Sequence, residues 1–190
     1  MGNYPLKVLL SSLLIGSVVV SSIVAALYFS SQLHGIGPQA SVESYPLSLS
    51  VGLDKTEFML GENITVRCAI KNISNETITI TFYAAYGYVD DNRVYHQVYC
   101  DFIVTDINGT EVYRWSQIQG ALGTIYSITL NPNEERANNL LWWPPLLKEV
   151  PPGTYFVRAR TPTTGTFQIN NGPRISIESP SIKFIIKADT

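Results

Sequence analysis

The sequence predicts an all-β protein: an immunoglobulin-like antiparallel β-sandwich of about seven to eight short strands, preceded by one N-terminal transmembrane helix. Three observations lead to this prediction. From residue 46 onward, short runs alternate apolar and polar residues and are separated by turn-forming residues. The dipeptide Asn108-Gly109 marks one tight hairpin. Residues 8–29 form a single apolar run without charge.

Residues 8–29 have the length and composition of a membrane-spanning helix. The run VLLSSLLIGSVVVSSIVAALYF is uncharged, and about 20 apolar residues suffice to cross the bilayer core. Lys7 precedes it and the next Lys or Arg is Lys55, so the positive-inside rule predicts that residues 1–7 are cytoplasmic and the rest is outside. Cleavage as a signal peptide is the alternative, because small residues lie near the end of the run. We therefore expect a single-pass protein of the cell membrane that contacts lipid, or a secreted one.

A polar segment that contains Gly and Pro, residues 30–45, is expected to link the membrane segment to an extracellular domain at 46–190. The strand-like runs of that domain are 47–53, 63–71, 77–83, 125–130, 154–160 and 181–187, together with a hairpin at 99–116. Residues 84–98 are expected to form a long loop, and so is the apolar stretch 140–147. We find no internal repeat.

The hairpin at 99–116 is the clearest element. Asn108-Gly109 accepts positive φ at both central positions of a tight turn. Folding the chain there sets Val104 opposite Tyr113. The side chains on the resulting apolar face are Cys100, Phe102, Val104, Tyr113 and Trp115. The other face is mostly polar, so this pair should be buried on one side only.

Four segments carry a family resemblance. They are Ile70–Phe82, the hairpin Asp101–Ser116 with its ending Arg-Trp-Ser, the turn Leu130–Glu134, and Trp142 or Trp143 followed by Val150-Pro-Pro-Gly-Thr-Tyr155. In this order they resemble the BsuPI-type intracellular proteinase inhibitor family, over about residues 47–159, although Asn133 stands where the family usually has Gly. The resemblance implies a β-sandwich and, more loosely, proteinase inhibition, in which residues 84–98 or 139–148 would fill the proteinase cleft.

Cys68 and Cys100 both fall on inward faces of expected strands. In an exported domain two such cysteines are expected to form a disulfide, and two free buried thiols are the alternative. His96 lies near Cys100 in the sequence, but the remaining ligands of a zinc or copper site are missing. We expect no metal and no cofactor.

Four sequons of the form Asn-x-Ser/Thr occur in the chain. Their asparagines are Asn63, Asn72, Asn75 and Asn108. Three lie in expected loops or turns, and the fourth opens a strand. If the domain is external, glycosylation of at least one is expected.

Two stretches are candidates for binding a protein partner. The first is the set of tyrosines around the 84–98 loop, of which the candidate contacts are Tyr86, Tyr88 and Tyr95. Tyr provides rigid, amphipathic contact area. The second is the apolar loop with Trp142, Trp143 and Leu146. The alternative for both is that these rings fill the core and its ends.

The formal net charge is −2, so the chain lacks the basic surface that nucleic-acid binding requires. No Gly-x-Ser-x-Gly, His-Glu-x-x-His or phosphate-binding loop occurs, and we expect no enzyme. The first hypothesis is a membrane-anchored extracellular module that binds a protein. Its more specific version is that the protein bound is a proteinase, which the module inhibits. The alternatives are a filament subunit that donates the strand 41–54 to a like subunit, and an accessory outer domain of a membrane enzyme complex.

Overall fold

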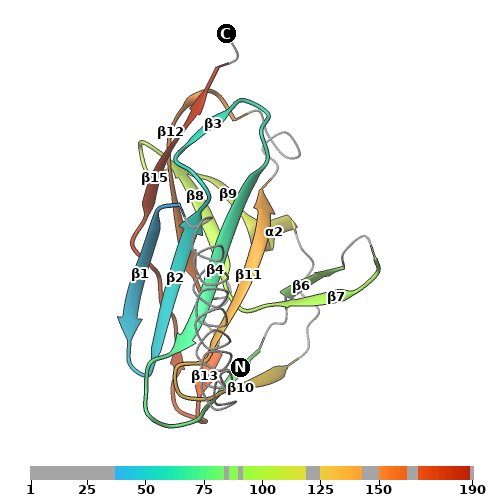
Figure 1. Ribbon diagram of the computed structural model, residues 1–190, viewed down its shortest axis with the longest axis vertical. Coiled ribbons are helices and arrows are strands. Elements are labelled where there is room, and N and C mark those ends of the chain that lie inside the picture. The colour runs from blue at the N-terminus through green and yellow to red at the C-terminus, as the bar shows by residue number, and fades with distance from the viewer. Residues whose placement is uncertain are drawn as a thin grey trace, which may run out of the picture. The chain divides into compact units, whose positions relative to one another are not determined.

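Two facing β-sheets form the body of the domain (Figure 1). The structure is a computed structural model, and it describes residues 37–83, 86–89, 92–118, 125–142, 150–161 and 167–188. The first sheet consists, in spatial order, of β1 (Gln39–Ser44), β2 (Leu47–Leu53), β4 (Ile64–Asn72) and β11 (Glu135–Trp142). The second consists of β3 (Glu57–Met59), β15 (Ile182–Lys187), β12 (Gly153–Arg160), β8 (Asp101–Asp106) and β9 (Glu111–Arg114).

Smaller elements complete the described fold. A third sheet has the order β10 (Tyr126–Leu130), β5 (Ile78–Phe82), β13 (Phe167–Ile169) and β14 (Arg174–Ile175). A two-stranded sheet pairs β6 (Tyr86–Val89) with β7 (Tyr95–Val98), and one short helix, α2, spans Trp115–Ile118. The strand pairs are antiparallel except β15 with β3, which is parallel. The prediction of an all-β protein is confirmed, with more strands than expected because short ones such as β3 and β14 build the edges.

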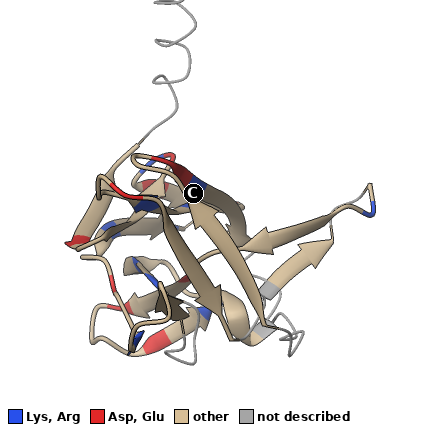
Figure 2. Ribbon diagram, turned by 90° about the horizontal axis from the view of Figure 1, so that it is seen from below, with Lys and Arg blue, Asp and Glu red and all other residues tan. Residues whose placement is uncertain are grey.

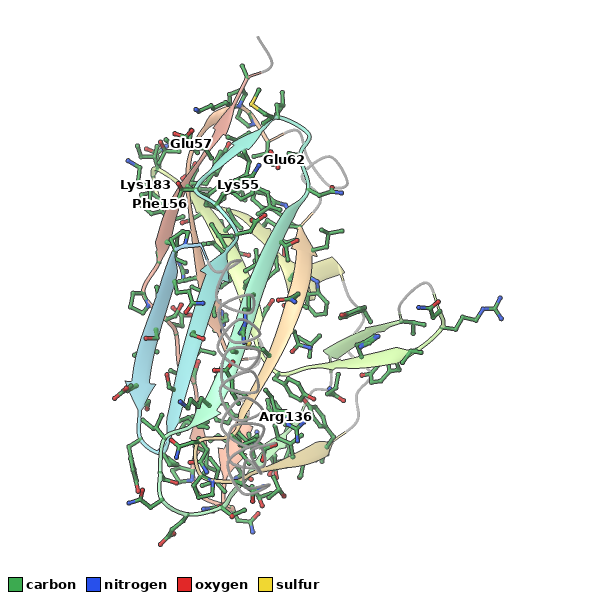
Figure 3. All side chains as sticks on the ribbon, viewed as in Figure 1. Lys55, Glu57, Glu62, Arg136, Phe156 and Lys183 are labelled. Atoms are coloured by element: carbon green, nitrogen blue, oxygen red, sulfur yellow. The ribbon has the colours of Figure 1, made fainter. Side chains whose placement is uncertain are left out.

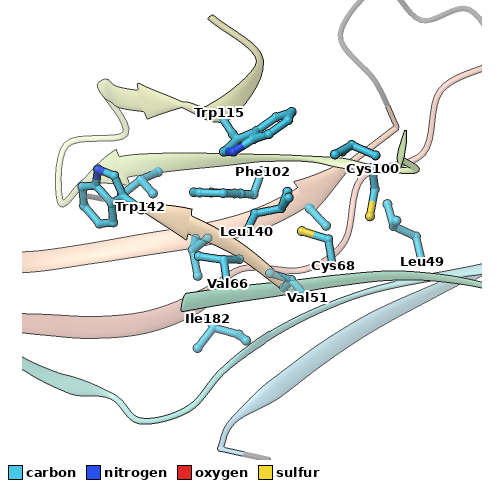
Figure 4. Close-up of a cluster of buried hydrophobic side chains, with 14 of the residues drawn as sticks. Leu49, Val51, Val66, Cys68, Cys100, Phe102, Trp115, Leu140, Trp142 and Ile182 are labelled. Carbon is cyan, nitrogen blue, oxygen red and sulfur yellow. The ribbon is translucent and has the colours of Figure 1, made fainter. Parts of the chain in front are cut away.

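The core lies between the two large sheets and follows the alternation of the sequence. On β2, Leu47, Leu49 and Val51 are buried, while Ser48 and Ser50 between them are not. Burying a Leu side chain stabilises the fold by about 1.5–3 kcal/mol relative to leaving it exposed. Figure 4 shows the side chains from both sheets meeting in this layer. The period-two pattern therefore decides which face of each strand is inside.

Trp142 belongs to this core and not to the surface. It ends β11, is 1% exposed, and lies 5.3 Å from Tyr113 and 5.9 Å from Phe184 between ring centroids. It thus joins β11 of the first sheet to β9 and β15 of the second. The prediction that Trp142 contacts a partner was wrong, because the sheets close around its ring. Trp143 and Leu146 lie outside the described residues.

The hairpin is confirmed in its buried face and corrected at its end. Val104 pairs with Tyr113 as expected. All five predicted inward residues of the hairpin are buried. Trp115, however, opens α2 instead of continuing the strand. The opposite face is less exposed than expected, because Ile103 and Thr105 are buried as well.

Three segments predicted as linker or loop are strands. Residues 39–44 of the expected linker form β1, so the linker prediction was too long. Residues 86–89 and 95–98 of the expected long loop form a hairpin. Residues 135–142 form β11, in which alternate side chains, those of Asn138, Leu140 and Trp142, point into the core. The expected donor strand, 41–54, lies in the chain's own sheet as β1 and β2.

Among the residues that the structure describes, no helix is long and apolar enough to cross a membrane. Residues 8–29, on which the prediction of a transmembrane helix rests, lie outside them.

The prediction of a disulfide between Cys68 and Cys100 was wrong. Both cysteines are buried and free. Their side chains lie in the same part of the core (Figure 4). The Cys68 thiol donates to the backbone oxygen of Asp101 at 3.9 Å. Burial raises the pKa of the Cys100 thiol well above its ordinary value, and the neighbouring thiol of Cys68 raises it further. The Cys100 group is therefore a neutral thiol, and both cysteines are shielded from solvent.

We expect neither cysteine of the native protein to react with a water-soluble thiol reagent near neutral pH, because both side chains are fully buried and the reagent cannot reach them. Both should react at once after unfolding in guanidinium chloride without reductant. Labelling followed by intact-mass measurement checks this. A chain that takes up no label when unfolded, until a reductant is added, would show that the thiols are oxidised to a disulfide.

Candidate protein-binding hairpin

A narrow hairpin extends from the side of the sandwich. We call residues 86–89 and 92–98, which comprise β6, β7 and the tip residues Asn92–Val94, the arm. Figures 1 and 2 show both of its strands leaving the body in the same direction. Among the described strands, β6 and β7 pair only with each other. Within the described residues, the arm is therefore a two-stranded sheet with no third strand paired to it.

The base of the arm is held by Asn138 of β11. Its side-chain amide donates to the backbone oxygen of Gln97 at 2.8 Å, and its side-chain oxygen accepts from the backbone nitrogen of Tyr99 at 3.0 Å. Asn138 is itself almost fully buried. Because one amide satisfies a donor and an acceptor of the same backbone stretch, it sets both the position and the direction of the chain leaving β7.

Two aromatic residues reinforce this base. The hydroxyl of Tyr126, from β10, donates to the backbone oxygen of Val98 at 3.0 Å. Burial raises the pKa of Tyr126 well above its ordinary value, which keeps the hydroxyl protonated as a donor. On the other strand, Tyr88 packs edge-on against Trp115 with centroids 6.5 Å apart. Both strands of the arm are thus attached to the body.

Trp115 is in turn fixed by a buried carboxylate. Asp101 accepts hydrogen bonds from the backbone nitrogen of Ser116 at 3.1 Å and from its hydroxyl at 2.5 Å. It also accepts from the backbone nitrogen of Phe102 at 2.9 Å. Burial raises the pKa of Asp101, and these hydrogen bonds oppose the rise. The bonds hold the first turn of α2, and with it the ring against which Tyr88 packs.

The two faces of the arm differ. Tyr88 pairs across the strands with His96, and their rings stack with centroids 5.0 Å apart. This face is half-buried toward the body. Val89 pairs with Tyr95 on the opposite face. Val89 is 62% exposed and Tyr95 44% exposed, and Val94 near the tip is 51% exposed. The outward face and tip therefore present an exposed apolar patch.

Gly87 lets the Tyr95 ring lie flat on the arm. A Cβ atom at Gly87 would clash with Cζ and Oη of Tyr95. Partial burial in this position raises the pKa of Tyr95. Packing an aromatic ring over a cross-strand glycine stabilises an isolated hairpin. The conformation of Tyr95 is thus set within the arm.

Arg93 adds a positive charge at the tip. It is exposed and has a φ of 63°, in the left-handed region that suits a tight reversal of the chain. Figure 2 shows Lys/Arg colouring at the outer end of the arm, where the sequence also places two acidic residues in the same turn. Asp90 and Asp91 lie outside the described residues. The described tip therefore combines a cation with apolar neighbours.

Tyr88 and Tyr95, two of the predicted contact residues, lie together in the arm. Tyr86 is in β6, and its side chain lies outside the described residues. Sequence reasoning missed Asn138, Tyr126 and Gly87. An Asn on the inward face of an alternating run is a signal that could have pointed to Asn138, because a buried amide requires partners.

Three of the four sequons are exposed, at Asn63, Asn75 and Asn108. Asn72 is not: its side-chain amide is buried and donates to the backbone oxygens of Glu76 at 2.7 Å and Leu130 at 3.0 Å. Among the four candidate sequons, Asn72 is therefore inaccessible in the folded chain, because its nitrogen is buried and already bonded. Glycosylation of at least one of the other three stays a prediction.

The described residues contain no group of three or more His, Cys, Asp or Glu side chains placed to hold a metal ion. Charged side chains gather instead in ion pairs at the β3 end of the body. Among them are Lys55 with Glu62 and Lys187 with Glu57 at 2.5 Å. Figure 3 labels Lys55, Glu57 and Glu62 there. Exposed pairs of this kind are worth about 0–1 kcal/mol, so they neither form a site nor dominate stability.

The model of the BsuPI family, described as "Intracellular proteinase inhibitor", matches residues 51–165. This is more than half of the chain, and the chain therefore belongs to the BsuPI family. The matched range includes the whole arm and Asn138. The resemblance inferred from the four sequence segments is confirmed, and the family is one of inhibitors and not of enzymes.

No curated protein matches the sequence. Among solved structures, a β-glucosidase from Listeria innocua is 16% identical with a TM-score of 0.40, over 77% of this chain and 17% of that chain. The CARDB domain of a Pyrococcus furiosus protein, in complex with di-metal ions, is 11% identical with a TM-score of 0.37, over 72% and 84%. Spo0M, a sporulation control protein from Bacillus subtilis, is 16% identical with a TM-score of 0.38, over 77% and 51%. Similarities this distant carry no functional argument.

We expect Asn138→Ala to loosen the arm while leaving the sandwich folded. The substitution leaves the Gln97 oxygen and the Tyr99 nitrogen without their partner, which costs about 1–3 kcal/mol. Hydrogen–deuterium exchange should become faster in residues 95–99 and remain slow in β2 and β4. Asn139→Ala is the matched control, since Asn139 is the next residue of β11 and is exposed. Equal exchange in both variants would show that Asn138 does not hold the arm.

Proposed function

We propose that this chain is a proteinase inhibitor and that the arm enters the substrate cleft of its target. The observation that carries the proposal is the arm itself: a narrow hairpin with a fixed base and exposed apolar side chains on its outward face and tip, within the residues that match an inhibitor family. A substrate cleft is a concave surface, and a projecting hairpin is the shape that fills it.

Rigidity is what separates an inhibitor from a substrate in this proposal. A flexible loop loses conformational entropy when it binds, whereas a preorganised one does not. The bonds from Asn138 and Tyr126 and the packing of Tyr88 on Trp115 supply that preorganisation. Because β6 and β7 have no other partner strands among the described residues, their outer edges can also pair with extended backbone in the target.

We propose further that residues 8–29 anchor the chain in the cell membrane and that the domain lies outside the cell. The charge-free run and Lys7 before it support this orientation. In this location the exposed sequons would be open to glycosylation.

We expect the full-length protein to inhibit at least one member of a panel of trypsin-, chymotrypsin-, elastase- and subtilisin-type serine proteinases. The double variant Val89→Asp/Val94→Asp should raise the inhibition constant tenfold or more, because it places charges where apolar contact is made. Ile107→Asp is the control: it is also an exposed apolar residue, 70% exposed, but lies in the turn between β8 and β9.

The inhibition constants, measured in steady-state assays, decide the role of the arm. Equal inhibition by the arm variant and the wild type would remove the arm from the mechanism. Equal losses in the arm variant and the Ile107 control would point to a general effect of added charge.

For the anchor, we expect the full-length chain to stay in the membrane fraction after alkaline carbonate washing and to lose its domain when intact cells are treated with an external protease. A variant lacking residues 8–29 should be released into the soluble fraction. Release of the full-length chain by carbonate would contradict the membrane anchor, and protection of its domain in intact cells would contradict the orientation.

A further inference from the structure

Among the described strands, none pairs with the outer edge of β1. β1 pairs with β2 and lies at the end of its sheet (Figure 1). The Leu53 nitrogen donates to the Pro38 oxygen at 3.1 Å. Because hydrogen-bonded and non-hydrogen-bonded pairs alternate along an antiparallel ladder, Ala40, Val42 and Ser44 bond toward β2. The backbone groups of Gln39, Ser41 and Glu43 therefore point outward along the edge.

β1 has little of the protection that such an edge usually has, since Glu43 is its one charged residue. Natural edge strands are blocked by lysines, prolines or bulges. The sequence of β1, Gln-Ala-Ser-Val-Glu-Ser, contains neither lysine nor proline. Its register with β2 runs from Gln39 to Ser44 without a shift, so β1 also has no bulge. Ala40 and Val42 pack against the core but are only partly buried. The edge thus leaves both backbone groups and apolar surface without cover from β2.

We propose that a second copy of this chain occupies the edge, with the two β1 strands antiparallel about a two-fold axis. A residue whose backbone groups point outward must pair with a residue of the second copy whose backbone groups also point outward. This rule allows Ser41 to lie opposite Ser41 of the second copy. Gln39 then lies opposite Glu43. Ala40 lies opposite Val42, so each apolar side chain covers the partly buried one of the other copy. The first sheet continues across the axis, and a closed dimer results.

The charge of β1 is compatible with a second copy at this edge. Glu43 is the one charged residue of β1. In the proposed register the two copies of Glu43 are four residues apart along the strand, which is about 14 Å. This exceeds the Debye length of about 8–10 Å at physiological ionic strength, so their repulsion is largely screened. Each Glu43 carboxylate can accept instead from the side-chain amide of Gln39 of the other copy.

Cysteine crosslinking of the full-length protein tests the register. In a hydrogen-bonded antiparallel pair the Cα atoms are about 5.5 Å apart, within the range of about 4.4–6.8 Å for a disulfide. Ser41→Cys should give a covalent dimer under copper–phenanthroline oxidation. Glu43→Cys alone should not, but mixed with Gln39→Cys it should. The native cysteines are buried and do not compete. Efficient crosslinking of Glu43→Cys with itself, or none with Ser41→Cys, would overturn the proposal.

The oligomeric state provides the second measurement. Light scattering of the full-length protein in detergent should show a dimer. Ser41→Pro removes an outward N–H without breaking a bond to β2, and it should raise the dimer dissociation constant at least tenfold, while Ser41→Ala should not. A wild-type monomer at all concentrations would overturn the proposal. So would a Ser41→Pro variant, folded by circular dichroism, that dimerises like the wild type, since the contact would then lie elsewhere.

Discussion

The arm depends on one buried amide. A two-stranded hairpin without a second layer is at best marginally stable in water, so its direction has to come from its base. Asn138 supplies this by bonding to Gln97 and Tyr99 from a strand more than 38 positions further along the chain. The amide is tolerated in the core because both of its polar atoms are hydrogen-bonded, since an unpaired buried polar group would cost about 1–3 kcal/mol. A single side chain, Asn138, is thus both part of the buried interior and the contact that positions the candidate site.

The buried core and the surfaces proposed to bind partners are formed by different parts of the molecule. The two large sheets bury a layer of mostly Leu, Ile, Val and aromatic side chains. Because these side chains are buried, they are not available to contact a partner. Interaction is left to the parts that the layer does not cover. Among the described residues these include the arm, whose outward face carries Val89 and Tyr95, and the outer edge of β1. In the two proposals, the first offers side chains to a partner of different shape, whereas the second offers backbone to a partner of identical sequence. The two surfaces are chemically distinct and can act independently.

The sequence was sufficient for the parts of the fold that local chemistry decides. Alternation identified the inner strands β2 and β4, and Asn108-Gly109 identified the turn between β8 and β9. It was insufficient where distant residues decide. The arm looked like a loop because its base is held by Asn138 and Tyr126, and Trp142 looked exposed because the sheet that covers it comes from other segments. The tyrosines at 88 and 95 were found as candidates, but nothing local indicated that Gly87 sets the position of one of them. The cysteines were correctly placed inside, yet burial alone does not decide whether two thiols are oxidised.

The central claim is that the arm lies in the substrate cleft of a proteinase, and site-specific photocrosslinking tests it most directly. Val94 would be replaced by p-benzoylphenylalanine and the protein irradiated with an inhibited proteinase. If the arm enters the cleft, crosslinks form to residues that line it, and they are lost when an active-site-directed inhibitor already fills the cleft. Crosslinks to a surface away from the cleft, or crosslinks that a filled active site leaves unchanged, would contradict the claim.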